Sequence, residues 1–169
     1  LRIEQLLLLP AIGLNTAVLS IVGQNFGAKE FRRIGEVYFK AIFYGAILMI
    51  IAGFVLFFGG ALLVQLFTND PKVIDFGVKY LTIAALIGPV YPIFFITNAF
   101  FQGIKKPLYA TLINLFRIVI VPFLVMSLIL SKFNGSYESL FIGLLVINWF
   151  FGILVIIIVK FFFLKKITT

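Results

Sequence analysis

The stretch AIFYGAILMIIAGFVLFFGGALLVQLF (residues 41–67) runs without a charged side chain and almost without a polar one. About twenty apolar residues in a helix cross the roughly 30 Å hydrocarbon core of a bilayer. This stretch is longer than that, which permits a tilt but does not fix its angle. Because its hydrophobicity is continuous rather than alternating, it predicts a membrane helix and not a strand of a membrane barrel.

Four further segments meet the same criterion. The expected membrane helices cover approximately residues 5–26, 40–67, 80–101, 107–131 and 140–160. The connections between them are short and rich in turn-forming residues, as in FTNDPKV (67–73), QGIKKP (102–107) and SKFNGSYES (131–139). The sequence therefore predicts one unit over residues 1–169, an all-α polytopic membrane protein without a soluble domain.

The composition supports a lipid environment and excludes several functions. The chain is 63% hydrophobic and 12% charged, with a mean hydropathy of +1.20, whereas soluble domains are about 45–50% apolar and about 25% charged. It has no cysteine and no histidine, which removes disulfides, thiolate sites, the usual general base and the commonest metal ligand. We therefore expect the bilayer as a partner, no metal site, no cofactor and no enzyme.

The net charge of +8 is explained by topology rather than by a nucleic-acid partner, because basic residues gather in the cytoplasmic loops of membrane proteins. Nine of the fourteen basic residues fall on one side of the expected bundle and three on the other. The nine are Lys29, Arg32, Arg33, Lys40, Lys105, Lys106, Lys160, Lys165 and Lys166; the three are Lys72, Lys79 and Lys132. We expect a multi-pass protein of the cell (inner) membrane with a cytoplasmic C-terminus.

The stretch VGQNFGAKEFRR (22–33) changes from apolar and amide residues to a basic cluster. We expect Gly27 to end the first helix at the cytoplasmic interface, since glycine is favoured just past a helix end. Gln24 and Asn25 then lie at interface depth. A direct functional role for these two amides is the alternative.

Polar groups at membrane depth are candidates for function because they are costly, at about 2.5–3.5 kcal/mol for a charge on insertion scales. Glu4 and Asn15 are eleven residues apart, close to three turns, so they share one face of the first helix. A carboxylate on a face that lines an aqueous cavity could bind a cation or a proton. Alternatively, Glu4 reaches the outer headgroups beside Arg2.

The third expected helix combines prolines with a polar stripe. Tyr80, Tyr91, Asn98 and Gln102 are separated by eleven, seven and four residues, and Pro89 and Pro92 lie among them. Each proline removes a backbone donor. Broken helices of this kind line substrate cavities in transporters, although a proline kink in a membrane helix is often purely structural.

Arg117 lies ten residues past Pro107 in the fourth helix, about 15 Å along its axis. At that depth it needs a partner or a water-filled cavity, and Asn114, three residues earlier, could bond to it. Asn148 is surrounded by apolar residues in the last helix. We expect it to join helices by hydrogen bonding.

These motifs together resemble a family. RIEQLLLLPAIGLNTAVLSIVGQNFGAKE (2–30) resembles the eighth helix of multidrug and toxic compound extrusion (MATE) transporters. LFTNDPKVI (66–74), AFFQGIKKP (99–107) and LFRIVIVP (115–122) match the family in the same order. The motif residues at the cytoplasmic helix end are Gly23, Gln24, Asn25, Gly27 and Ala28. The resemblance implies helices eight to twelve of a twelve-helix protein, most of its C-terminal lobe.

The resemblance also implies a function, a secondary antiporter that exports cationic or amphipathic drugs in exchange for Na⁺ or H⁺. The N-terminal lobe of the same chain would be a further partner. We do not expect the opening residues LRIEQLLLLP to be a signal peptide. The helix matching the tenth, residues 80–101, contains no Asp or Glu, which leaves Glu4 as the acid in view. The candidate pathway residues are Glu4, Asn15, Tyr91, Asn98, Gln102, Asn114 and Arg117.

The sequence leaves two alternatives open. A lipid-linked oligosaccharide flippase of the same superfamily shares the architecture and carries more positive charge in its cavity, which Arg2 and Arg117 would supply. A membrane scaffold subunit that transports nothing would use its polar residues only to pack helices.

Overall fold

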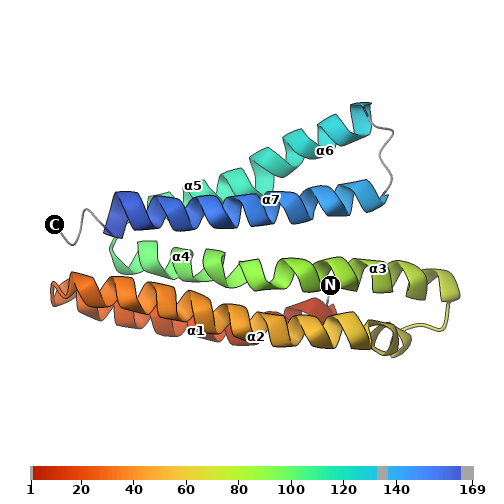
Figure 1. Cartoon of the computed structure of the whole chain (residues 1–169), viewed down its shortest axis with the longest axis horizontal. Helices are drawn as coiled ribbons and strands as arrows, with labels where there is room; N and C mark the ends of the chain where they lie inside the picture. The colour runs from red at the N-terminus through yellow and green to blue at the C-terminus, as the bar shows by residue number, and fades with distance from the viewer. Residues whose placement is uncertain (1, 133–136, 165–169) are drawn as a thin grey trace.

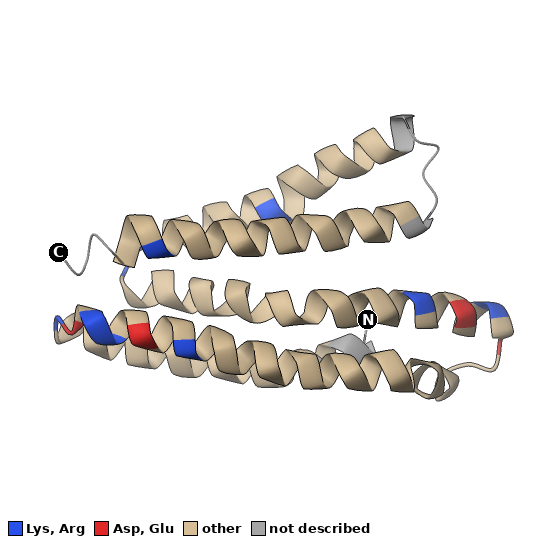
Figure 2. Cartoon of the chain, viewed as in Figure 1, with Lys and Arg blue, Asp and Glu red and all other residues tan. Residues whose placement is uncertain are grey.

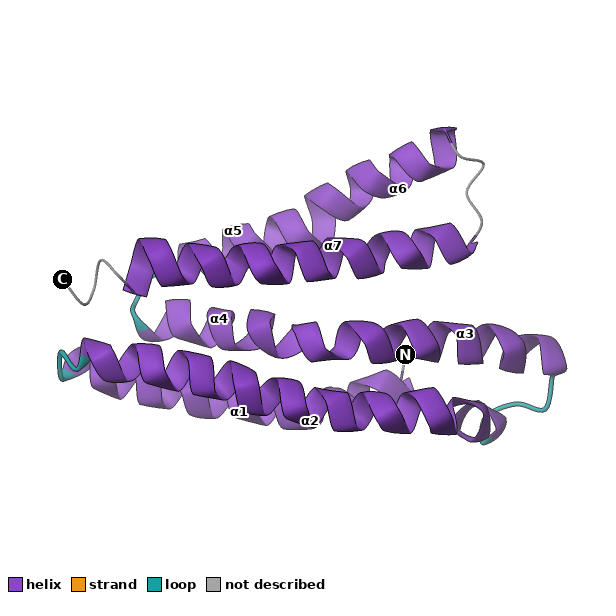
Figure 3. Ribbon diagram, in the orientation of Figure 1, coloured by secondary structure: helices purple, strands orange, loops and turns teal. Residues whose placement is uncertain are grey.

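The structure is a computed structural model that describes residues 2–132 and 137–164. Its described part is helical apart from the short connections between helices (Figure 3). The elements are α1 (Arg2–Gly27), α2 (Phe31–Gln65), α3 (Pro71–Ile87), the 3₁₀ turn η1 (Gly88–Val90), α4 (Tyr91–Gly103), α5 (Pro107–Leu115), the π-helical segment η2 (Phe116–Ile120), α6 (Val121–Lys132), α7 (Tyr137–Ile158) and the π-helical segment η3 (Val159–Leu164).

Within the described residues, five helical rods are long and apolar enough to cross a membrane. They are α1, α2, the α3–η1–α4 rod, the α5–η2–α6 rod and the α7–η3 rod. The expected all-α membrane fold with five spans is confirmed. In the elongated bundle, α1 and α2 lie beside α3 and α4. The helices α5, α6 and α7 lie on the opposite side of α3 and α4 (Figure 1).

The connections lie at two opposite ends of the bundle. Residues 28–30 and 104–106 and the end of α7 lie together at one end, and residues 66–70 lie at the other (Figure 1). Most charged residues lie toward these ends, with long uncharged stretches of helix between them (Figure 2). The grouping of loops that underlies the charge asymmetry is therefore present in the structure.

The helices extend beyond the apolar segments from which they were expected. α2 begins at Phe31 rather than near residue 40 because Ile34 and Tyr38, four residues apart, are buried while Arg32 and Arg33 remain exposed. Hydropathy locates the part of a helix that lies in lipid. It misses an amphipathic turn that continues outside it.

The start of α3 is fixed by local turn chemistry. The Asp70 carboxylate accepts a hydrogen bond of 2.9 Å from the Lys72 backbone N–H, and Pro71 occupies the first helical turn. An acidic N-cap followed by proline is a strong helix start. Residues 71–79 are therefore helical, and the exposed pair Asp75 and Lys79 lies one turn apart with 3.2 Å between the charged atoms.

The expected end of the first helix at Gly27 is confirmed, since α1 ends there, but the left-handed residue of the cap is not this glycine. Gly27 keeps a negative φ inside the last turn, and Lys29 takes the left-handed conformation at φ 59°. The Glu30 N–H bonds to the Asn25 carbonyl and the Lys29 N–H to the Phe26 carbonyl, which is a Schellman cap. In this cap the left-handed position is that of Lys29, two residues after Gly27.

The connection between α4 and α5 repeats the same cap. Lys105 has φ 59°, the Lys106 N–H bonds to the Phe101 carbonyl, and the Lys105 N–H bonds to the Gln102 carbonyl. Gly103 again precedes the left-handed lysine by two residues. Two loops at one end of the bundle are thus built in the same way.

Lys29→Gly should stabilise the protein because glycine occupies the left-handed region without strain. We expect the free energy of unfolding to rise by about 0.5–1 kcal/mol. This is less than the full strain of a left-handed lysine, because glycine has greater freedom in the unfolded chain. Thermal unfolding in detergent should show a higher midpoint for Lys29→Gly and a lower one for Ala28→Gly, whose backbone is not left-handed. An unchanged or lower midpoint for Lys29→Gly would contradict the strain argument.

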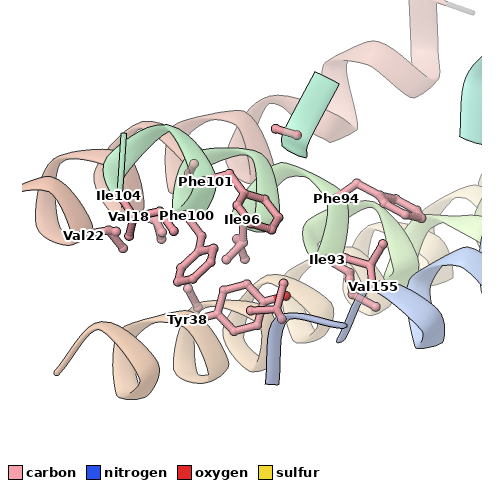
Figure 4. Close-up of a cluster of buried hydrophobic side chains, with 14 of the residues drawn as sticks. Val18, Val22, Tyr38, Ile93, Phe94, Ile96, Phe100, Phe101, Ile104 and Val155 are labelled. Atoms are coloured by element: carbon pink, nitrogen blue, oxygen red, sulfur yellow. The ribbon is translucent and has the colours of Figure 1, made fainter. Parts of the chain in front are cut away.

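The larger of the two buried clusters lies toward the end of the bundle that holds residues 28–30. Val18 and Val22 of α1, Tyr38 of α2 and Phe100 and Phe101 of α4 pack together there, joined by side chains of α7 (Figure 4). Most of α5, η2 and α6 is exposed in the isolated chain. The core therefore holds α1, α2, α4 and α7 as one unit and leaves the α5–η2–α6 rod at the edge.

Candidate functional site

A cavity of about 620 Å³ lies between the α3–η1–α4 rod, the α5–η2–α6 rod and α7. Its walls are mostly aliphatic and aromatic, with a few polar groups. The lining residues are Tyr80, Ile83, Ala84, Ile87, Tyr91, Arg117, Ile118, Val119, Pro122, Phe123, Met126, Phe141, Leu144 and Asn148. This combination of apolar walls and few polar groups is typical of sites for organic ligands.

The cavity exists because the α5–η2–α6 rod bends. Proline at position 122 cannot donate to the carbonyl of Ile118, and its ring crowds that carbonyl. The chain responds with a π-helical turn over Phe116–Ile120, and α6 diverges from α7 beyond it (Figure 1). Single π turns inside α-helices occur often at functional sites. Here the widened turn carries Arg117.

Arg117 is half-buried between two helices. Its Nη1 donates a hydrogen bond of 3.0 Å to Oδ1 of Asn148 on α7. Its guanidinium carbon lies 3.9 Å from the centre of the Phe94 ring on α4, a distance at which a cation is attracted to the ring face. Its Nε is buried and has no hydrogen-bond partner among the described residues.

The orientation of Asn148 is fixed by its own helix. Its Nδ2 donates a hydrogen bond of 2.8 Å to the Leu144 carbonyl, so its Oδ1 points toward Arg117. Asn148 thus joins α7 to the α5–η2–α6 rod, as expected for an interhelical residue. Arg117 thus bonds to a residue of a distant helix. Asn114, which the sequence offered as a possible partner on the same rod, is half-buried.

The expected polar stripe on the third helix divides into two parts. Tyr80 and Tyr91 line the cavity with Arg117. Asn98 and Gln102 are outside its lining, and Nε2 of Gln102 donates a hydrogen bond of 3.1 Å to the side-chain Oδ1 of Asn98. Asn98 lies seven residues past Tyr91, about 10 Å farther along the helix, so the same face continues beyond the end of the cavity.

Of the two candidates on α1, Asn15 is not among the described residues that line this cavity. The Asn15 side chain is half-buried, and its Oδ1 has no hydrogen-bond partner within the described part of the chain. The side chain of Glu4 lies outside the described residues, as does that of Arg2. Pro10 is accommodated within α1.

The motif at the end of α1 has a packing role in this structure. Val22 is fully buried and Gly23 contacts α4 beside Gly103. The Asn25 side-chain amide donates a hydrogen bond of 2.8 Å to the Ile21 backbone carbonyl. The Gln24 side-chain amide lies 3.4 Å from the Ser20 hydroxyl. Gly27 and Ala28 are exposed at the turn. The amides bond to their own helix and leave the interhelical contact to Val22 and Gly23.

Two buried features were not singled out from the sequence. The first is Phe94, whose ring face contacts the Arg117 guanidinium. The second is the hydrogen bond of 2.8 Å between Tyr38 of α2 and Thr97 of α4. Thr97 precedes the singled-out Asn98, and Tyr38 lies in the amphipathic turn that hydropathy missed. The four-residue spacing of Ile34 and Tyr38 was the available signal.

Comparison with known proteins connects this geometry to a family. The MatE family profile matches residues 1–128. A Bacillus subtilis (strain 168) protein described as "Probable multidrug resistance protein YpnP" is 27% identical over 114 residues, which are 68% of this chain and 26% of that protein. This chain therefore spans about a quarter of the length of that relative.

Two solved structures show the same fold. One is an outward-facing conformation of a multidrug resistance MATE family transporter of the MOP superfamily, with a TM-score of 0.93 at 18% identity over 99% of this chain and 38% of that one. The other is the MATE transporter ClbM in complex with Rb⁺, with a TM-score of 0.85 at 25% identity over 91% of this chain and 36% of that one. The five rods are thus arranged as in part of these larger structures.

Proposed function

This chain belongs to the MatE family, and from that premise we propose that it forms part of a secondary active transporter. Family members are transporters rather than enzymes. The proposed activity is export of cationic or amphipathic compounds in exchange for Na⁺ or H⁺. Since the chain spans only 26–38% of its relatives, we propose that it acts together with further helices of the same protein.

The observation that carries this proposal is the cavity between the three rods. A space of about 620 Å³ accommodates a drug-sized molecule. Its walls offer aromatic rings from Tyr80, Tyr91 and Phe141 and polar contacts from Arg117 and Asn148. A largely apolar cavity inside a bundle of membrane-spanning rods suits amphipathic guests that partition into lipid.

The proposed orientation places the end with residues 28–30 and 104–106 in the cytoplasm. That end carries the greater share of the basic side chains, and the positive-inside rule assigns such loops to the cytoplasm. The C-terminus then lies on the same side, and the protein is a multi-pass protein of the cell (inner) membrane.

For the coupling ion we propose Glu4 as the carboxylate on this chain. Its helix also carries Asn15, whose side-chain oxygen is buried without a described partner. A carboxylate and an amide oxygen on one helix face suit a hard monovalent cation or a proton. The family member ClbM was solved with Rb⁺, which supports a monovalent cation site in the family without distinguishing Na⁺ from H⁺.

Efflux measurements on the full protein encoded by the gene test this assignment. Glu4→Gln should lower ethidium efflux driven by a Na⁺ or pH gradient to the level of passive leak, because the neutral amide releases no proton and binds cations weakly. Glu30→Gln removes the same charge from the exposed turn and should leave the rate unchanged. Equal efflux by the wild type and Glu4→Gln would remove Glu4 from the mechanism, and gradient-independent leak by the wild type would remove the antiporter proposal.

A second candidate function is supported by Arg117. A flippase for an anionic lipid-linked substrate would use a cation in its cavity, and Arg117 lines this one. Proteoliposomes that scramble or flip a phosphate-linked lipid but export no ethidium would favour that function over drug export.

A further inference from the structure

Arg117 places a positive charge inside a segment that the bilayer surrounds. Its rod from Pro107 to Ile129 is apolar enough to span the membrane, and the arginine lies about 15 Å along it. A charge at that depth costs about 2.5–3.5 kcal/mol on insertion scales. A residue this costly needs a compensating partner.

The described surroundings compensate the charge only in part. Asn148 is a neutral acceptor at 3.0 Å, and Phe94 offers its ring face at 3.9 Å. Guanidinium carries five N–H donors, and the Nε donor is buried without a partner in the described part of the chain. The described residues that line the cavity include no carboxylate. Among the described lining residues, Arg117 therefore contributes the formal charge, which is positive.

The guanidinium lies between two described neighbours. Phe94 lies behind it and outside the cavity lining. Asn148 holds it from the side and lines the cavity itself. Arg117 itself also lines this cavity, whose other described walls are mostly apolar and aromatic. Charge-assisted pairs of arginine with carboxylate or phosphate are strong and directional, and low local dielectric strengthens them further.

We propose that Arg117 binds the oxyanionic group of an amphipathic molecule whose apolar body fills the cavity. This inference rests on the proposed function in that it identifies acidic amphipaths as a substrate class of the same cavity. Asn148 positions the guanidinium, and Phe94 backs it. The oxyanion can belong to a free carboxylate substrate or to the headgroup of an anionic lipid.

A matched pair of fluorescent probes tests the proposal without any transport. 1-Pyrenebutyrate and the uncharged 1-pyrenebutanol share ring and chain and differ in the headgroup. Binding to the full protein in phosphatidylcholine nanodiscs, with empty nanodiscs subtracted, should be about tenfold or more tighter for the butyrate, as a charge-assisted hydrogen bond requires. Equal affinity of the two probes for the wild type would overturn the proposal.

Two substitutions locate the effect at the guanidinium. Arg117→Gln should remove the preference for butyrate and leave pyrenebutanol binding within about twofold. Asn148→Asp keeps the arginine but places a carboxylate against it, so it should remove the same preference by occupying the guanidinium. A preference that persists in either folded variant would overturn the assignment to Arg117.

The two sources of the oxyanion are distinguished by competition. Phosphatidylglycerol added to the nanodiscs should displace pyrenebutyrate if a lipid headgroup is the natural occupant, and should fail to displace it if a free acid is. The preference for butyrate tests the site itself, and this competition identifies its occupant. A parallel efflux assay separates this inference from the proposed function, because binding without gradient-driven efflux retains the site and rejects the antiporter.

Discussion

Gly103→Leu is expected to abolish recovery of folded protein, a larger effect than that of any other substitution proposed for this chain. A Cβ atom at position 103 would lie 2.6 Å from Cγ1 of Val22, 2.9 Å from its Cβ and 3.2 Å from the Gly23 backbone nitrogen. These are atoms close to or within the α1 backbone, so no flexible end of a side chain can move aside. Overpacking of this kind costs about 1–3 kcal/mol for a few extra atoms.

The cost at Gly103 is high because α1 and α4 approach each other closely there. Val22 is fully buried, and α1 and α4 pack closely along their length. Gly103→Ala should lower the thermal midpoint, and Gly103→Leu should force α1 away from α4. The readout is monodispersity and thermal unfolding of the full protein in detergent.

A matched glycine on α2 provides the control. A Cβ at Gly59 meets only Leu63 of its own helix, at 3.9 Å. Gly59→Ala and Gly59→Leu should both be tolerated, because their side chains enter open space and glycine is a poor helix former. If Gly103→Leu gave folded protein with the stability of Gly59→Leu, the close approach of α1 and α4 would be refuted.

The fold was largely predictable because burial of apolar side chains in lipid decides where its helices lie. The continuous run over residues 41–67 alone requires a membrane helix, and the four similar segments follow by the same rule. Helix ends were less predictable. α2 starts at Phe31 because Ile34 and Tyr38 pack on α4 and α7, a tertiary effect that a hydropathy window does not contain.

The sequence could predict which polar residues lie at membrane depth, where they are energetically costly. It could not predict which of them contact one another in the structure. The depth of Arg117 marked it from the sequence, since a charge in lipid is rarely without purpose. Its actual neighbours, Phe94 and Asn148, lie 23 and 31 residues away along the chain, and no local periodicity joins them. The π turn at Phe116–Ile120 also rotates the helix beyond it, so a regular helical projection fails there.

Tyr38→Ala is the second change with a large expected effect, a loss of about 3–5 kcal/mol of stability by analogy with aromatic truncations in protein cores. Tyr38 has no exposed surface. Its ring packs edge-on against Phe100 with 5.3 Å between centroids, and its hydroxyl shares the 2.8 Å hydrogen bond with Thr97. Removing the ring leaves a cavity where α2, α4 and α7 meet.

Tyr38→Phe separates packing from hydrogen bonding. The ring remains and the bond to Thr97 is lost, at a cost of about 0.6 kcal/mol, typical of hydrogen bonds between membrane helices. The loss is small because the Thr97 hydroxyl can turn to the carbonyl one turn earlier on its own helix. Thermal unfolding in detergent should therefore rank wild type slightly above Tyr38→Phe and far above Tyr38→Ala.

Tyr44 supplies the control on the same helix, since it is 59% exposed. Tyr44→Ala removes the same atoms from the outer face and should leave the midpoint nearly unchanged. Equal losses for Tyr38→Ala and Tyr44→Ala would mean that the outer face of α2 is buried as deeply as the inner one in the full protein. A loss confined to Tyr38→Ala would instead establish that α2 is held to α4 and α7 through its amphipathic first turns, the part of the helix that lies beyond the continuous apolar run.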